Sequence, residues 1–242
     1  MRSAIKLELI DSEKGLKEFC EFFGLKARIA EKTKTAIRIE FEDPETGFIQ
    51  SFTFGGWMEL STEDFLQNYQ FRGHIRAYCI ALKAVREMGY TYIESLRQFV
   101  KGIYRLKIDR RLCLNGNSIN FEMYKNCQSL KKKLIQLERM IEIYLRALRQ
   151  DLRWLSAKYG FSYRIVPEAT RFLVEIGDAR ISVMPWGRYL YLKEPDKDPF
   201  CIKYKDELPA GLETVINLLS CDNRKNLMEM LEEQSRLDLP GD

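Results

Sequence analysis

Apolar residues recur at steps of three and four from residue 121 to residue 159, and this spacing predicts one long helix of about 38 residues. The a and d positions of its heptads stay apolar over about four heptads, as in a coiled coil. Leu145 and Leu152 at e, with Met140 and Trp154 at g, widen this side, so we expect several packing neighbours. The a and d seam, with Tyr159 at its end, contains Leu130, Leu134, Leu137, Ile141, Tyr144, Leu148, Leu155 and Tyr159.

The first 56 residues predict a β-α-β-β unit. Polar and apolar residues alternate over residues 5–9, which indicates a strand. Ser12 is a suitable N-cap for a helix over residues 13–23, which carries one apolar face. Alternation returns over residues 37–41 and 48–54, and the turn-forming residues between these two segments predict a hairpin.

The segment 57–160 is predicted to be helical. Ser61 with Asp64 resembles a capping box and favours a helix running toward Met88. Thr91 with Glu94 forms a second such pair, which predicts another helix through about Ile108. The long helix would follow and complete this region.

One short stretch of this region carries a family resemblance. Residues 82–96, with Gly89, Tyr90, Thr91 and Glu94 at the turn, resemble the helix-Gly-aromatic-Ser/Thr-x-x-Glu turn of mercury-resistance-type transcription regulators. That family places a long dimerisation helix next and then a variable C-terminal domain. Its DNA-reading winged helix has no counterpart in the strand-rich pattern of the first 54 residues. The resemblance therefore assigns no functional residue to this chain.

The last third changes to a period of two, which predicts a small antiparallel β-meander in residues 161–242. Gly177-Asp178 suits a two-residue hairpin, and a helix beginning near Pro209 would cover the apolar face of the sheet. A final surface helix is expected over residues 226–237. The sequence thus predicts an α+β fold with three regions.

Charge is distributed unevenly along the chain. The whole chain carries +4, but residues 97–160 hold 15 Lys and Arg against five acids, and both flanking segments are mildly acidic. Such asymmetry is typical of a surface that meets nucleic acid, a membrane or an acidic partner. Within this segment one basic residue recurs every seventh position on the side of the long helix opposite its seam. The candidate contact residues are Arg105, Lys107, Arg110, Arg111, Lys125, Lys132, Arg139, Arg146 and Arg153.

Aromatic residues add to this interpretation. Rings interleave with basic residues between Phe99 and Lys125, and rings next to cations suit stacking on bases. Tyr189, Tyr191 and Lys193 share one face of a predicted strand and form a second candidate platform. Both patterns are also common in half-buried strands and core helices.

Three classes of function remain open. We expect a non-enzymatic, regulatory protein whose basic segment contacts nucleic acid or a nucleoprotein complex. The alternative is a protein-interaction adaptor or homodimer that uses the apolar seam of the long helix, with the basic row only solvating its outer face. An enzyme with a diffuse site is the third class.

Catalytic and cofactor motifs are not found in the sequence, so no cofactor is expected. His74 is the only histidine, and its distance from Cys79 on a helix turns the two residues to different sides. Glu40, Glu42 and neighbouring acids of the hairpin offer oxygen ligands for a hard cation, but a solvated hairpin edge explains them better.

Cellular context follows from what the sequence lacks. Six cysteines are scattered without a close pair, which favours free thiols in a reducing compartment. No signal-peptide pattern and no apolar run of about 20 residues occurs. We therefore expect a cytoplasmic protein without a membrane partner.

Overall fold

The computed structural model shows an α+β protein built from two compact units. Unit 1 comprises residues 1–141 with 168–170, and unit 2 comprises residues 142–167 with 171–242. This boundary lies inside the longest helix, whereas the three regions expected from the sequence follow changes of periodicity. The described residues are 10, 12–55, 66, 69–109, 111–185, 189–195, 199–203 and 208–220.

The described helices agree in part with the sequence pattern. The Ser12 hydroxyl accepts a hydrogen bond from the amide of Gly15 at 3.1 Å and caps α1, as predicted. The expected strand at residues 5–9, the helix start at Ser61 and the final helix at 226–237 lie outside the described residues. The helices are α1 (Glu13–Glu21), α3 (Tyr69–Glu87), α4 (Cys127–Tyr159) and α5 (Leu208–Ser220), with short 3-10 turns at Glu94–Leu96 and Phe121–Met123.

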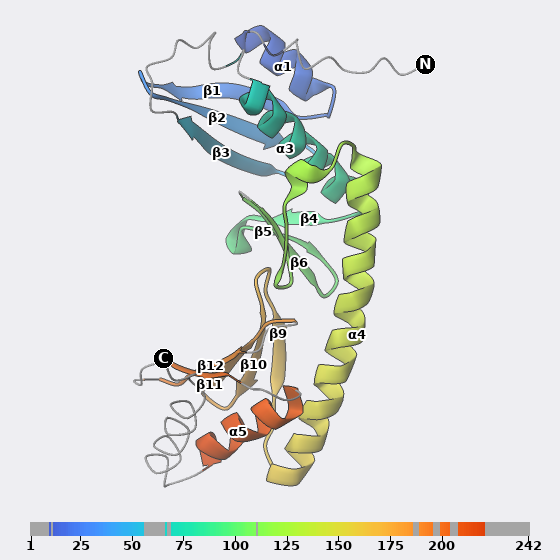
Figure 1. The fold of residues 1–242 in the computed structure, drawn as a ribbon, viewed down its shortest axis with the longest axis vertical. Coiled ribbons are helices and arrows are strands. Elements are labelled where there is room, and N and C mark those ends of the chain that lie inside the picture. Colours follow the sequence, from blue (N-terminus) through green and yellow to red (C-terminus); the bar gives the residue numbers. More distant parts are fainter. Residues whose placement is uncertain are drawn as a thin grey trace, which may run out of the picture. The chain divides into compact units, whose positions relative to one another are not determined.

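The first sheet of unit 1 is antiparallel, in the order β1-β2-β3. Ile37, Ile39 and Phe41 alternate along β2 and are fully buried, and α1 and α3 cover one face of the sheet (Figure 1). The hairpin between β2 and β3 was predicted, whereas β1 was missed because its residues alternate weakly. The strands are β1 (Lys26–Lys32), β2 (Ala36–Asp43) and β3 (Phe48–Gly55).

Arg86 fastens the end of α3 to two other parts of unit 1. Its guanidinium donates to the carbonyls of Phe23 at 2.8 Å and Gly24 at 3.4 Å. It also pairs with the carboxylates of Asp43 at 3.4 Å and Glu45 at 3.3 Å. Because the Asp43 side chain is only 1% exposed, Arg86 is the counter-charge of a buried carboxylate.

Residues 91–120 form a second sheet, so the helix predicted from Thr91 to Ile108 is wrong. Phe99, Leu106 and Ile108 are buried, and the residues between them on the strands are more exposed, so burial alternates with a period of two. The pair Thr91 and Glu94 had favoured a helix over this period. The resemblance to the regulator turn therefore ends at Gly89. The strands, in sheet order, are β4 (Thr91–Ile93), β5 (Gln98–Lys101), β6 (Tyr104–Ile108), β7 (Leu112–Leu114) and β8 (Asn117–Ile119).

The turn between β7 and β8 anchors this sheet. Asn115 and Gly116 both have positive φ angles, 42° and 91°, which is the requirement of a tight two-residue hairpin. Asn115 is fully buried. Its side-chain oxygen accepts a hydrogen bond from the backbone N–H of Arg105 at 3.1 Å, and its side-chain nitrogen donates one to the backbone carbonyl of Glu168 at 3.1 Å. These contacts explain why residues 168–170 belong to unit 1.

Unit 2 contains the predicted meander, in the order β13-β12-β11-β10-β9. Gly177 has φ +55° in a two-residue turn that pairs Ile176 with Ala179, as expected. Helix α5 lies against β12 and β13 (Figure 1). The fifth strand was not predicted in detail. The strands are β9 (Arg164–Pro167), β10 (Phe172–Ile176), β11 (Ala179–Val183), β12 (Tyr189–Lys193) and β13 (Phe200–Lys203).

Candidate nucleic-acid interface

Helix α4 is amphipathic, as the heptad pattern predicts. Its 33 residues begin at Cys127, later than the predicted start near Phe121, which lies in a separate 3-10 turn. Met140 and Trp154 at g are exposed, so only the e side widens the seam; Tyr144 and Tyr159 are half-buried. The buried side consists of Leu130, Leu134, Leu137, Ile141, Leu145, Leu148, Leu152 and Leu155.

The opposite side of α4 carries the basic row, defined here as Lys132, Arg139, Arg146 and Arg153. All four side chains are exposed. No carboxylate in the described part of the chain pairs with any of them. Their spacing of seven residues extends about 32 Å along the helix. Lys125 is also exposed but precedes the first turn of α4, so it is not part of the helical row.

One acid of the basic segment, Glu138, lies on the buried side of α4 and away from this row. Glu138 is only 8% exposed and faces inward. Its carboxylate accepts hydrogen bonds from the Tyr90 hydroxyl at 2.7 Å and from the Lys101 ammonium at 3.0 Å. Burial and the Glu138 carboxylate raise the pKa of Tyr90, so this phenol stays protonated and continues to donate. Glu138, one of the five acids of the segment, therefore has its charge paired inside unit 1.

The remaining candidate residues lie on the second sheet or beside it, because their segment is not helical. Arg105 is half-buried, and its guanidinium donates to the carbonyls of Gly102 at 2.6 Å and Tyr104 at 3.0 Å, which supports a turn. Lys107 and Arg111 are exposed, and Arg110 lies outside the described residues. The nine candidates therefore do not share one helical face.

Most of the interleaved aromatic rings are unavailable for stacking. Phe99, Tyr104 and Phe121 are buried, and Tyr124 is half-buried. Their periodicity reflects the core of unit 1. The aromatic interleaving therefore describes packing in this part of the chain and does not add to the basic row.

The meander of unit 2 presents a second polar surface. Tyr191 and Lys193 are exposed while Leu190 and Leu192 are buried, so the predicted face assignment of β12 is confirmed for these residues. The Tyr189 side chain lies outside the described set. Strand pairing also places four charged residues from four strands side by side, which the sequence alone did not reveal. This cross-strand row consists of Arg164, Glu175, Arg180 and Lys193.

This cross-strand row has an excess of positive charge. Glu175 pairs with Arg164 at 2.7 Å and with Arg180 at 3.6 Å, which leaves two net positive charges beside Tyr191. An exposed ring next to cations is the arrangement that single-strand-binding sheets use. Strand pairing brings these residues together from positions up to 29 residues apart.

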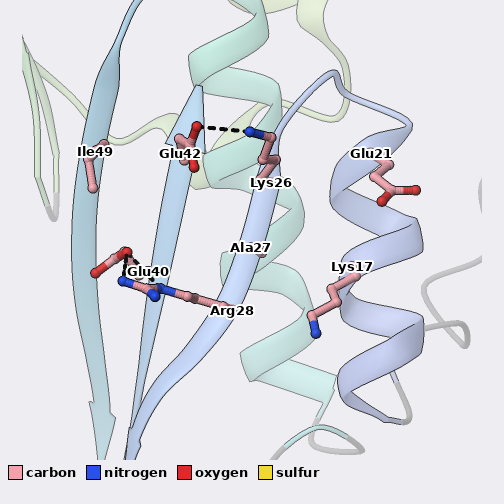
Figure 2. Close-up of a pocket in the computed structure, with 8 residues that line it drawn as sticks. All are labelled: Lys17, Glu21, Lys26, Ala27, Arg28, Glu40, Glu42 and Ile49. Carbon is pink, nitrogen blue, oxygen red and sulfur yellow. Dashed lines mark hydrogen bonds and ion pairs between the residues drawn. The ribbon is translucent and has the colours of Figure 1, made fainter. Parts of the chain in front are cut away.

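A hollow of about 470 Å³ on the first sheet is a weaker candidate, because its charges cancel. Figure 2 shows Lys26 directed at Glu42 and Arg28 at Glu40; the shortest N···O distances are 3.1 Å and 2.6 Å. Lys17 and Glu21 add one charge of each sign. Such exposed pairs contribute little stability and little net field.

The acids of the first hairpin do not converge on a cation. Glu40 and Glu42 point to the outer face, whereas Asp43 is buried and faces Arg86. In the described part of the chain no three His, Cys, Asp or Glu side chains are grouped as metal ligands would be. The hard-cation interpretation therefore has no support from this geometry.

Two thiols, those of Cys79 and Cys127, are held in their protonated form. Cys79 is fully buried, and its sulfur lies 3.9 Å from that of Cys20, a proximity that the scattered sequence positions concealed. Burial raises the pKa of Cys79 well above its usual value. Burial and the neighbouring Glu87 carboxylate raise the pKa of Cys127 to about 11. A thiol in this state is a poor nucleophile near neutral pH.

His74 and Cys79 do not form a pair. His74 is exposed, and its Nδ1 lies 2.5 Å from a Glu122 oxygen. Cys79 packs on the other side of α3 against α1. The helical angle between the two positions therefore separates them, as the sequence predicts.

Exchanges on α4 should separate its two sides. Leu148→Ala removes a fully buried side chain and should lower the free energy of unfolding by about 2–5 kcal/mol. Arg146→Ala, two residues earlier on the exposed side, should change it by less than about 0.5 kcal/mol. Chemical denaturation measures both; equal losses would mean that the basic row has a structural role.

Comparisons with known protein families, curated proteins and solved structures find no match to this chain. Among the helices that the structure describes, none is both long and apolar enough to cross a membrane. The function is therefore inferred from the charge, burial and contacts of the residues themselves.

Proposed function

We propose that this protein binds nucleic acid, or a nucleic-acid-containing complex, through the basic row of α4 and has a regulatory, non-enzymatic role. The observation that carries the proposal is the exposure of all four basic side chains without a carboxylate partner among the described residues. Cations that are not paired within the protein are free to replace the counterions of a phosphate backbone.

The spacing of the row supports a polyanion as the ligand. Successive cations are about 10 Å apart along the helix, so a compact anion contacts one of them and an extended backbone contacts several. The sheet surface around Tyr191 offers a ring next to Arg180 and Lys193, which suits contact with unpaired bases.

Salt dependence tests this proposal. Four phosphate contacts predict that the logarithm of the binding constant falls with the logarithm of salt concentration with a slope of about −3 to −4 on duplex DNA. Fluorescence anisotropy of labelled duplex and single-stranded oligonucleotides at several salt concentrations measures this slope. Absence of binding, or a flat slope, would contradict the proposal.

The alternative is a protein-interaction adaptor. The sequence suggested the apolar seam of α4 as the surface that an adaptor would use. The leucines of this seam are buried in the folded chain, so a partner cannot contact them while the fold is intact. A different observation favours it: Met140, Ile143 and Trp154 are exposed on one side of α4, and Ile143 is 68% exposed. Apolar residues at this spacing suit contact with a partner helix.

A further inference from the structure

A pocket in unit 1 combines aromatic rings with carboxylates and is independent of the basic row. Its volume is about 450 Å³, within the range of small-molecule sites. Four segments meet there: β3, α3, the end of β6 and the 3-10 turn before α4. The residues that define its chemistry are Phe52, Tyr78, Phe121, His74, Asp109 and Glu122.

The rings provide the apolar part of the pocket. Phe52 and Tyr78 lie with centroids 4.4 Å apart and planes inclined by 68°, so they form an aromatic corner. Phe121 supplies a third ring to the lining. The face of an aromatic ring carries partial negative charge and attracts cations.

The carboxylates of Asp109 and Glu122 give the pocket a negative charge. One oxygen of Glu122 lies 2.5 Å from His74, which fixes the side chain, and the second oxygen has no hydrogen bond or ion pair with a described residue. The Asp109 carboxylate has no ion pair in the described part of the chain. Among the described residues that line the pocket there is no lysine or arginine.

The pKa of the buried Tyr78 hydroxyl is consistent with an apolar, acidic environment. Burial first, and then the acidic groups of Cys79, Tyr92, Asp109 and Asp43, raise the pKa of Tyr78 well above its usual value. Among the described residues, the hydroxyl has one long hydrogen bond, which it donates to the Gln50 side-chain oxygen at 3.4 Å. The phenol therefore stays neutral, and Tyr78 adds no charge to the pocket that it lines.

We infer that this pocket binds a small organic cation, an alkylammonium or quaternary ammonium group, between the aromatic corner of Phe52 and Tyr78 and the carboxylates of Asp109 and Glu122. Aromatic rings solvate the alkyl groups that surround the charge, and the carboxylates supply the opposite charge. A neutral ligand of equal shape gains only the apolar part of this interaction.

Choline and its neutral isostere 3,3-dimethyl-1-butanol test the inference directly, because they differ in charge and hardly in shape. Titration of the whole chain, followed by NMR of aromatic and amide protons, should show choline binding at least about tenfold more tightly. Equal binding of both compounds, or binding of neither, would overturn the inference.

Variants locate the site. Asp109→Asn and Phe52→Leu should each weaken choline binding by about threefold to tenfold. Glu94→Gln, which neutralises an exposed carboxylate elsewhere in unit 1, should leave it unchanged. Circular dichroism melting confirms that each variant is folded. Unchanged choline affinity in folded Asp109→Asn and Phe52→Leu would overturn the assignment, whereas polyanion binding should be unaffected in all three.

Discussion

Replacing Lys132, Arg139 and Arg146 together by Glu should greatly weaken polyanion binding and leave the protein folded. The change alters charge by six units on an exposed side of α4 and leaves the buried leucines intact. Losing three phosphate contacts should weaken binding by at least about two orders of magnitude in 0.1 M salt, because counterion release is lost and repulsion is added. Anisotropy with labelled duplex measures this loss.

A matched variant controls for total charge. Lys14, Lys17 and Lys32 are exposed on α1 and β1, and their replacement by Glu changes the net charge equally. Because these residues lie outside the basic row, this variant should retain most of the affinity. Equal loss in both variants would mean that net charge, and not the basic row, determines binding.

A pull-down compares the two proposed functions in one experiment. A nucleic-acid binder should lose a nuclease-sensitive complex when the basic row is reversed. An adaptor that uses Met140, Ile143 and Trp154 should keep its protein partner, since that interaction depends on apolar burial. Retention of all partners, with no nucleic acid bound by the wild type, would favour the adaptor.

Arg86→Met should destabilise unit 1 by about 3–5 kcal/mol, because the substitution leaves the buried Asp43 carboxylate without a counter-charge. It also removes the donors that hold the carbonyls of Phe23 and Gly24 after α1. Urea denaturation measures the loss in the free energy of unfolding.

The same exchange at an exposed ion pair is the control. Arg38 pairs with Glu31 at 3.4 Å on the surface, so Arg38→Met should cost less than about 1 kcal/mol. Adding Asp43→Asn to Arg86→Met should restore part of the stability, since the uncompensated charge is removed. If Arg86→Met and Arg38→Met cost the same, burial of the Asp43 charge is not what makes Arg86 important.

Local patterns predicted several elements correctly. The Ser12 cap, the hairpin before Phe48, the Gly177 turn and the two sides of α4 all depend on residues within a few positions of each other. Helix periodicity fixes which α4 side chains face outward, so exposure of the basic row was predictable from sequence. The role of the row in binding stays a prediction.

Only tertiary structure decided the features that join distant residues. Thr91 and Glu94 satisfy a local capping pattern, yet strand pairing with β5 makes residues 91–93 a strand, because sheet hydrogen bonds and a buried Phe99 outweigh a local preference. The segment predicted as a helix from Thr91 to about Ile108 therefore forms the strands β4, β5 and β6.

The candidate sites show the same division. The sequence determined that this chain has an amphipathic long helix with a basic outer row, since a helix imposes its own periodicity. It contained no indication that Asp43 meets Arg86, that Glu138 meets Lys101, or that His74 and Glu122 share a pocket. These pairs are separated by 37 to 48 residues, and only the packing of whole elements brings them into contact.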